Sequence, residues 1–180
     1  LQYYGTKSGS RRVFREAGVP LPAAFEDLRD EGDLTRALVE LRRSRPGIRR
    51  AVVKLNESFS GEGNAVVTYP QSPEGDVAAA LAAVALPTET DTHASFLDEF
   101  QRMGGVVEEY IEGRELYVGA IGNERMRVLP TWELDFGSLA ESGEPIATAR
   151  VKHSPGYQKK HRIDIRRDYN PSTGEESNVV

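Results

Sequence analysis

The sequence contains no cysteine, which excludes disulfide bonds, thiolate metal ligands and a cysteine nucleophile among its 180 residues. Histidine is scarce as well, because His93, His153 and His161 are the only imidazoles and their spacing does not match a set of metal ligands. No apolar run approaches the roughly 20 residues that a helix needs to cross a bilayer, and the N-terminus lacks a signal-peptide layout. We therefore expect a cytoplasmic location and no membrane partner.

Positive charge is also in deficit. Lysine and arginine total 23 against 28 aspartates and glutamates, which gives a formal net charge of -5. Because nucleic-acid phosphates require a basic surface, this balance argues against wholesale nucleic-acid binding, and any phosphate site must be local. With 38% hydrophobic and 28% charged residues, the chain is long enough for one ordinary core or for two small lobes.

Hydrophobic periodicity predicts an α/β arrangement in about the first hundred residues and an antiparallel sheet after them. Helices are expected over 8–17, from a cap at Asp33, over 76–86 and over 94–103, and strands over 51–54 and 65–69. Residues 104–136 are typical of strand, break, strand, tight turn and strand, with Gly122-Asn123 as the hairpin signal. From Arg166 the sequence is polar and aperiodic, which predicts a mobile tail or the start of a loop.

The segment VVKLNESFSGEGNAVV, residues 52–67, places Lys54 at the end of an apolar run, before a small-residue loop and a second apolar run. Glycine lets successive backbone N–H groups converge on an anion, so the loop is a candidate phosphate site. An ordinary glycine-rich hairpin is the alternative, and it is the commoner one when the loop is taken alone. The loop is not a Walker loop, because in that pattern the lysine follows the glycines and a helix comes next.

Further segments extend this pattern: TKSGSRRVFREAGVPLP (6–22), VVEEYIEGRELYVGAIGN (106–123) and ARVKHSPGY (149–157). Together with 52–64 they occur in the order and spacing of ATP-grasp ligases, and the chain most resembles the D-alanine:D-alanine ligase and amino-acid or peptide ligase branch. The resemblance implies an α+β ATP-grasp fold of two lobes with ATP bound between them, the C-terminal lobe being incomplete. It divides the chain into an entry segment with the first helix (1–21), an N-terminal lobe (22–107) with a glycine-rich loop (58–64), a partial C-terminal lobe (108–165) and a polar tail (166–180).

The resemblance also implies roles for individual residues around the phosphates. Lys7 matches a lysine that contacts phosphate, and Lys54 matches one that contacts the α-phosphate and the adenine edge. Lys152 matches a catalytic lysine that reaches the transferred phosphate from a loop. The loop that closes over the phosphates would bind them through Ser58, Ser60, Gly61, Glu62 and Gly63.

A second group of residues corresponds to the adenine and ribose site. Glu108 would face the adenine amino group, and Glu115 would hold the ribose hydroxyls. The base would also contact backbone groups of the hinge residues Glu109, Tyr110 and Ile111. Without the resemblance, the lysines would be solvated surface residues and the glutamates a charged sheet edge.

The activity implied is that of an ATP-dependent carboxylate–amine ligase acting through an acyl phosphate. A carboxylate attacks the γ-phosphate of ATP, and an amine then displaces phosphate from the acyl carbon. The cofactors are ATP and Mg²⁺, the other partners are an amino acid or peptide as carboxylate and amine, and a homodimer is possible. The metal ligands are unknown: the family's E-x-N motif is matched only by Glu176-Ser177-Asn178, which we interpret as coincidence because no apolar strand precedes it.

Since few residues precede Lys7 and no metal-binding strands follow Lys152, we expect the chain to be a fragment or an excised domain. Two other functions stay open. One is a non-catalytic, regulatory ATP-binding module of ATP-grasp fold, and the other is an unrelated α+β interaction domain in which the motifs occur by chance.

Overall fold

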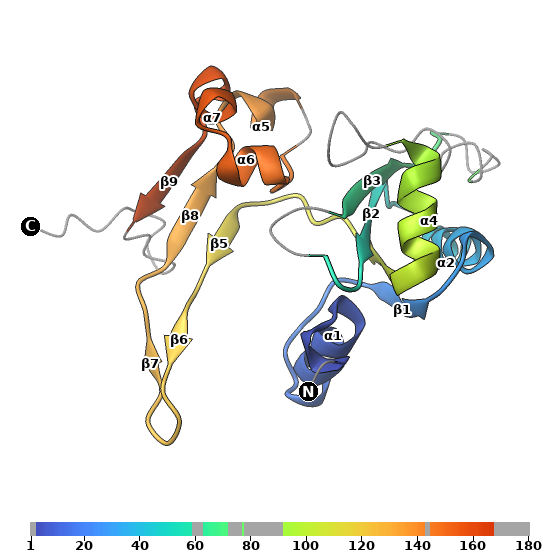
Figure 1. The fold of residues 1–180 in the computed structure, drawn as a ribbon, viewed down its shortest axis with the longest axis horizontal. Helices are drawn as coiled ribbons and strands as arrows, with labels where there is room; N and C mark the ends of the chain where they lie inside the picture. The colour runs from blue at the N-terminus through green and yellow to red at the C-terminus, as the bar shows by residue number, and fades with distance from the viewer. Residues whose placement is uncertain (1–2, 59–62, 72–76, 78–91, 143–144, 168–180) are drawn as a thin grey trace, which may run out of the picture. The chain divides into compact units, whose positions relative to one another are not determined.

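The computed structural model describes residues 3–58, 63–71, 77, 92–142 and 145–167. The chain divides into two compact units, Leu1–Ile111 and Glu112–Val180, and each has its own sheet and its own core (Figure 1). The fold is mixed α+β, as predicted. Within the described ranges, no helix is long and apolar enough to cross a membrane.

Unit 1 is built around a four-stranded sheet of order β1-β4-β2-β3. Its strands are β1 (Ala24–Leu28), β2 (Arg50–Leu55), β3 (Asn64–Thr68) and β4 (Gly105–Glu109). Its described helices are η1 (Tyr3–Gly5), α1 (Lys7–Glu16), α2 (Glu31–Ser44) and α4 (His93–Met103). The strands predicted over 51–54 and 65–69 are present. Every described strand pair in this sheet is antiparallel, so this unit does not have the α/β arrangement predicted for the first hundred residues.

One face of this sheet packs against α2 and α4 and forms the core of unit 1 (Figure 1). Leu34, Leu38 and Leu41 are fully buried along one side of α2, as their helical spacing predicts. The helix begins earlier than predicted, because Asp30 rather than Asp33 is its cap: Asp30 Oδ1 accepts a hydrogen bond from the Asp33 N–H at 2.7 Å.

Helix α4 confirms the helix predicted over 94–103 and completes this core with Phe96 and Phe100. It begins at a capping box, in which the side chains of Thr92 and Ser95 each accept a hydrogen bond from the backbone N–H of the other. The helix predicted over 76–86 lies outside the described residues except for Val77, which is buried in the same core.

The opposite face of the sheet is covered in part by α1. Because side chains alternate along a strand, β2 presents Val52 and Lys54 to this face, and β4 presents Val106 and Glu108. The helix predicted over 8–17 is confirmed, ending before Gly18, whose φ is +72°. Its buried residues are polar or small, namely Ser8, Gly9 and Arg11, whereas Val13 and Phe14 are exposed.

Unit 2 contains a three-stranded antiparallel sheet of order β5-β8-β9 and a two-stranded ribbon, β6-β7. Its strands are β5 (Glu115–Tyr117), β6 (Ala120–Ile121), β7 (Arg127–Val128), β8 (Trp132–Asp135) and β9 (Asp164–Arg167). Its described helices are α5 (Ser138–Ser142), α6 (Ala149–His153) and α7 (Pro155–His161). Its core is small, and it consists of Leu134, Phe136, Ala147 and Val151 with partly buried neighbours.

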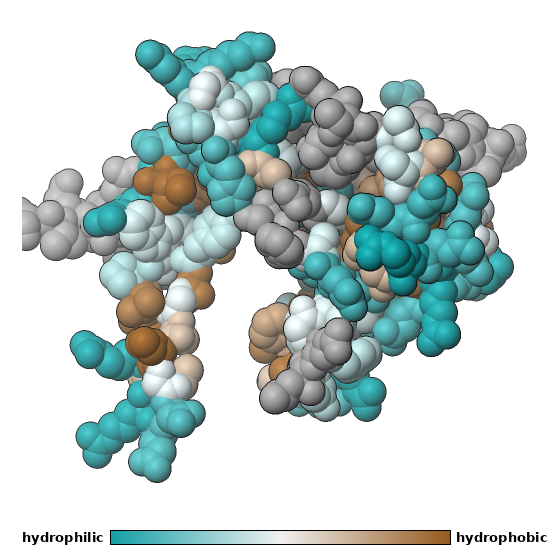
Figure 2. Space-filling view, in the orientation of Figure 1, coloured by the Kyte–Doolittle hydropathy of each residue, from teal (hydrophilic) through white to brown (hydrophobic). Residues whose placement is uncertain are grey.

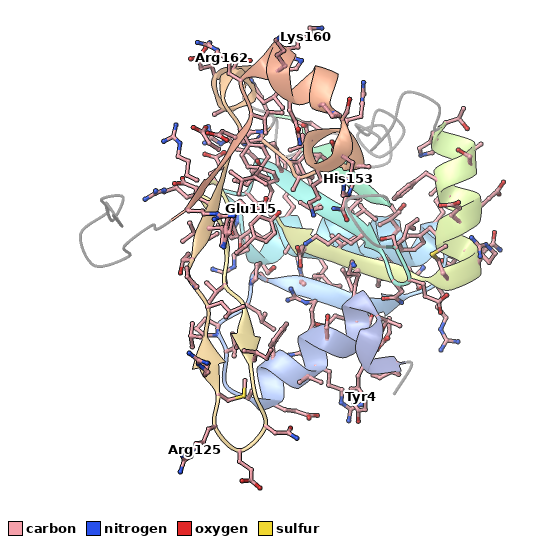
Figure 3. The ribbon with its side chains drawn as sticks, turned by 60° about the vertical axis from the view of Figure 1, so that its left-hand side comes forward. Tyr4, Glu115, Arg125, His153, Lys160 and Arg162 are labelled. Atoms are coloured by element: carbon pink, nitrogen blue, oxygen red, sulfur yellow. The ribbon has the colours of Figure 1, made fainter. Side chains whose placement is uncertain are left out.

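Two sequence predictions for this unit need correction. The β6-β7 connection is not a tight turn, because residues 122–126 separate the paired residues Ile121 and Arg127, with Arg125 near the tip (Figure 3). Arg166 and Arg167 do not start a tail, since they pair with Glu133 and Trp132 in strand β9. The side chain of Arg167 also stacks on the Trp132 ring, with 4.2 Å from the guanidinium carbon to the ring centroid.

Candidate functional site

The start of α1 is joined to the end of β2 by one side chain, Asn56. Its Oδ1 accepts hydrogen bonds from the backbone N–H of Ser8 at 3.0 Å and from the Ser8 hydroxyl at 2.8 Å. Its Nδ2 donates to the Met103 carbonyl at the end of α4 at 3.3 Å, and its own carbonyl accepts from the Lys7 N–H at 3.1 Å. Asn56 therefore fixes the first turn of α1 against both β2 and α4.

This junction brings Lys7 to the glycine-rich loop. The Lys7 ammonium donates to the Ser58 carbonyl at 2.8 Å, at the point where the loop begins. Helix α1 starts at the same place, where Thr6 Oγ1 accepts from the Gly9 N–H at 2.9 Å. The positive end of the helix dipole and a lysine ammonium thus lie beside the first residue of the loop.

The two described ends of the loop, Ser58 and Gly63, lie close together. Gly63 has a φ of +68°, and a Cβ built on it would lie 2.6 Å from the Ser58 Cβ, so only glycine fits there. The Ser58 hydroxyl donates to the Leu55 carbonyl at 3.0 Å. Ser60, Gly61 and Glu62 lie outside the described residues, so their predicted phosphate contacts stay predictions.

Lys54 and Glu108 lie on the sheet face that α1 covers, and they form an ion pair. The second carboxylate oxygen of Glu108 accepts from Arg11 Nη1 at 2.8 Å, and Arg11 also donates from Nε to Glu26 at 2.9 Å. Glu26 forms a further ion pair with Arg15. Burial raises the pKa of Glu26, but hydrogen bonds from Arg15 and Arg11 outweigh this effect and leave the pKa below its ordinary value.

The hinge residues after Glu108 are engaged in the sheet of unit 1. The Glu109 N–H donates to the Ala23 carbonyl at 2.8 Å, and the Tyr110 N–H donates to the Arg50 carbonyl at 3.2 Å. The Arg50 guanidinium carbon also lies 4.1 Å from the centroid of the Tyr110 ring. Ile111, the last residue of unit 1, is exposed.

In unit 2, Tyr117 connects two of the predicted site residues. Its hydroxyl donates to Glu115 Oε1 at 2.6 Å, and the Lys152 ammonium lies 6.0 Å from the centroid of its ring. Figure 3 shows Glu115 on its strand and His153 at the end of α6, next to Lys152 in the chain. Burial raises the pKa of the Tyr117 hydroxyl, and the hydrogen bond to Glu115 raises it further, so the hydroxyl keeps its proton.

Lys152 lies on a helix rather than on the loop that the resemblance implies. Helix α6 is capped at its start by Thr148, whose Oγ1 accepts from the Val151 N–H at 3.4 Å. At its end, Gln158 Nε2 donates to the carbonyls of Val151 at 2.8 Å and Lys152 at 3.1 Å. The backbone that carries Lys152 is therefore fixed by side chains at both ends of this short helix.

An ion pair between Arg114 and Glu133 stabilises the strand that carries Glu115. Arg114 donates to Glu133 through two nitrogens, with 2.6 Å from Nε to Oε1. The pKa of Glu133 is lowered by this hydrogen bonding and by the positive charge of Arg114. The pair joins β5 to β8 next to the predicted ribose-binding residue.

Metal ligands were left unassigned by the sequence, and the described residues add no candidate. In the described parts of the chain, no three histidine, aspartate or glutamate side chains are arranged to hold a metal ion. The E-x-N triplet at 176–178 lies outside those parts.

Comparison with known proteins supports an ATP-grasp relationship. Residues 1–71 match the family model described as "IQCH-like, ATP-grasp". The structure is similar to the crystal structure of D-alanyl-alanine synthetase A from Vibrio cholerae O1 biovar eltor str. N16961, with a TM-score of 0.53 and 15% sequence identity. That likeness covers 99% of this chain and 43% of the synthetase chain, so the chain spans less than half the length of that protein. No curated protein matches the sequence significantly.

These findings confirm the predicted ATP-grasp fold: a mixed α+β chain with antiparallel sheets. They agree with the position of the resemblance in the sequence, because the matched residues 1–71 include Lys7, Lys54 and the glycine-rich loop. An ATP-grasp fold is typical of ATP-dependent ligases and of ATP-binding modules.

The structure also identifies supporting residues that sequence reasoning missed. Asn56 and Ser8 hold the start of α1 beside Lys7, Arg11 binds the Lys54 partner Glu108, and Tyr117 and Gln158 lie around Lys152. The sequence did carry a signal for the α1 residues. Arg11 follows Ser8 by three residues and Lys7 by four, so the three side chains lie on one side of the helix. No comparable sequence signal marks Asn56, whose partners lie in segments far from it in the chain.

Proposed function

We propose that this chain supplies the ATP-binding lobes of an ATP-dependent carboxylate–amine ligase that joins amino acids or peptides. The observation that carries the proposal is the junction in unit 1. There Lys7, from the start of a helix, and Lys54, from a strand far along the chain, are both placed at the end of β2 that leads into the glycine-rich loop. Phosphoryl transfer needs such dispersed positive charge and little covalent help from the protein.

In the proposed reaction, the residues of the chain bind and orient ATP. Lys7 and Lys54 contact phosphate oxygens, the loop 58–64 covers them, and Lys152 contacts the phosphoryl group that is transferred. Glu108 and the hinge 109–111 bind the base, and Glu115 binds the ribose. Mg²⁺ bound to the phosphates would neutralise further charge, with ligands that we do not assign.

The chemistry itself requires no nucleophile from the protein. A carboxylate oxygen of the first substrate attacks the γ-phosphorus, the bond to the bridging oxygen breaks, and ADP leaves. The amine of the second substrate then attacks the acyl carbon, phosphate leaves with the bonding electrons, and the amine proton passes to solvent. This scheme is consistent with a chain that lacks cysteine.

The test is a calorimetric titration with AMP-PNP, a non-hydrolysable ATP analogue, with and without Mg²⁺. We expect saturable binding to the wild-type chain. Lys54→Met should weaken it by about tenfold or more, because a hydrogen bond to a charged group contributes roughly 1.5–3 kcal/mol. Lys160→Met, which removes an exposed lysine of α7, is the matched control and should bind like the wild type. A folded wild-type chain that does not bind, or equal effects of both substitutions, would contradict the proposal.

The second candidate is a non-catalytic ATP-binding module of the same fold. The family model that matches residues 1–71 is described as "IQCH-like, ATP-grasp", and a binding module of this fold is consistent with that description. The two candidates differ in whether the protein turns over ATP. A ligase should release phosphate from ATP only when both a carboxylate and an amine substrate are present. A binding module should bind AMP-PNP but release no phosphate from ATP under the same conditions.

A further inference from the structure

We infer that Arg11 is a positioning residue, which neutralises Glu108 and thereby leaves the charge of Lys54 available to the phosphates of ATP. This inference rests on the proposed function, because it concerns the same nucleotide site. It adds a residue that touches neither the base nor the phosphates and acts through a neighbour.

All three nitrogens of the Arg11 guanidinium donate hydrogen bonds. Nε donates to Glu26 at 2.9 Å, Nη1 to Glu108 at 2.8 Å and Nη2 to the Pro22 carbonyl at 2.7 Å. The side chain is only 9% exposed. A planar guanidinium held at three positions has one orientation, so the cation that faces Glu108 is fixed.

Glu108 divides its two oxygens between two cations. Oε2 accepts from Arg11, and Oε1 pairs with Lys54. The Glu108 side chain is 11% exposed and the Lys54 side chain is 29% exposed, so Lys54 is the partner that is more open to solvent. A carboxylate this buried needs a cation beside it, and Arg11 meets that need whether or not Lys54 stays.

The charges form a row of alternating sign across α1 and the sheet. In order they are Arg15, Glu26, Arg11, Glu108 and Lys54. Both outermost charges of the row are cations, Arg15 at one end and Lys54 at the other, and Lys54 is the one near the glycine-rich loop. With Arg11 in place, the single carboxylate of Glu108 is shared, so Lys54 keeps net positive charge toward an incoming phosphate.

Removing the Arg11 charge changes this balance. Glu108 would then lose its fixed cation and would hold Lys54 as its ion-pair partner, and phosphate would have to compete with a buried carboxylate for the same ammonium. Replacing Glu108 by glutamine in the same chain removes that competitor. The amide oxygen of glutamine still accepts a hydrogen bond from an adenine amino group, so the contact proposed for the base is retained.

The test measures AMP-PNP affinity by calorimetry for Arg11→Met, Arg11→Lys, Glu108→Gln and the double variant Arg11→Met/Glu108→Gln. We expect Arg11→Met to bind about tenfold more weakly than the wild type, which is within the usual coupling between contacting charges. The double variant should bind within about threefold of Glu108→Gln, and Arg11→Lys should lie between wild type and Arg11→Met. Arg12→Met, which removes a neighbouring exposed arginine of α1 that pairs with Glu16, is the matched control.

The outcomes separate the inference from the proposed function. If the folded wild type does not bind AMP-PNP, the proposed function fails and the inference with it. If the wild type binds and Arg11→Met binds AMP-PNP equally well, the inference alone is overturned. It is also overturned if Arg11→Met lowers AMP-PNP affinity by the same factor in the Glu108→Gln background as in the wild type. Thermal melting reports whether each variant folds. Should Arg11→Met not fold, Arg11→Gln, which removes the charge but keeps a polar side chain, takes its place in the same comparisons.

Discussion

Replacing Asn56 with alanine should loosen α1 from the sheet of unit 1 while leaving unit 2 intact. The Asn56 side chain accepts two hydrogen bonds from Ser8 and donates one to the Met103 carbonyl. Ser8 is only 1% exposed, so its donors would be left without this acceptor in a site that water reaches poorly.

The size of the effect follows from these bonds. Each contributes on the order of 0.5–1.5 kcal/mol to stability, and an unsatisfied buried donor costs about 1–3 kcal/mol. Since the bonds share one side chain and are not additive, we expect Asn56→Ala to lower the stability of unit 1 by about 2–3 kcal/mol. Ser10→Ala is the control: it removes one hydrogen bond within α1, from Ser10 Oγ to the Lys7 carbonyl, and should cost about 0.5 kcal/mol or less.

The assay must resolve the two units. Trp132, the only tryptophan, lies in β8 of unit 2, so its fluorescence on urea unfolding reports that unit and serves as an internal reference. Amide hydrogen exchange along α1 and β2 reports unit 1. Asn56→Ala should speed exchange in α1 and leave the fluorescence midpoint unchanged. Amide protection in α1 as strong as in the wild type, or an equal loss of stability in both units, would refute the conclusion that Asn56 stabilises unit 1 locally.

Further predictions concern packing and ionisation. Gly105→Ala should destabilise unit 1 by about 1–3 kcal/mol, because a Cβ there would lie 2.6 Å from the Phe100 ring. Urea unfolding followed by circular dichroism measures this change, and wild-type stability of the variant would show that the strand can shift to make room. Glu26 has a lowered pKa, so its contribution to stability is full above its ordinary value of 4.5 and is lost as the pH falls through the folded-state pKa. Glu26→Gln should therefore be less stable than wild type at pH 7 and should approach it in acid; parallel pH profiles would contradict this. Tyr117 and Tyr69 both have a pKa raised by burial, so ultraviolet titration should show them ionising above the ordinary value of 10.0, and Tyr117→Phe should reduce that late titration by one tyrosine.

Much of the fold could be predicted because local signals and packing agree. Leu34, Leu38 and Leu41 repeat at helical spacing, and they form the buried side of α2. Strand direction could not be predicted in this way, since β4 pairs with β1 and β2 through contacts far apart in the sequence. Boundaries failed where two signals competed, as at Asp30 and Asp33, which are both acids able to cap a helix.

The candidate site was predictable in part, through motifs that identify residue types at set positions. Sequence motifs indicated Lys7 and Lys54, and the structure places both at the junction of α1 with β2. The motifs did not indicate what holds them. The Lys54 partner Glu108 was expected to face adenine, and its ion pairs with Lys54 and Arg11 follow only from strand register and helix placement.

Helix α1 shows why such supporting residues are hard to find in a sequence. Periodicity arguments assume that the apolar side of a helix is the buried side. In α1 the relation is reversed, since Ser8 and Arg11 are buried and Phe14 is 48% exposed. A helix packs this way only when its polar side chains find partners in the structure, and here each does: Ser8 with Asn56, and Arg11 with the carboxylates of β1 and β4. A short helix whose polar residues share one face and whose first residue is a candidate ligand contact is therefore a signal for a supported site, even where hydrophobic periodicity gives none.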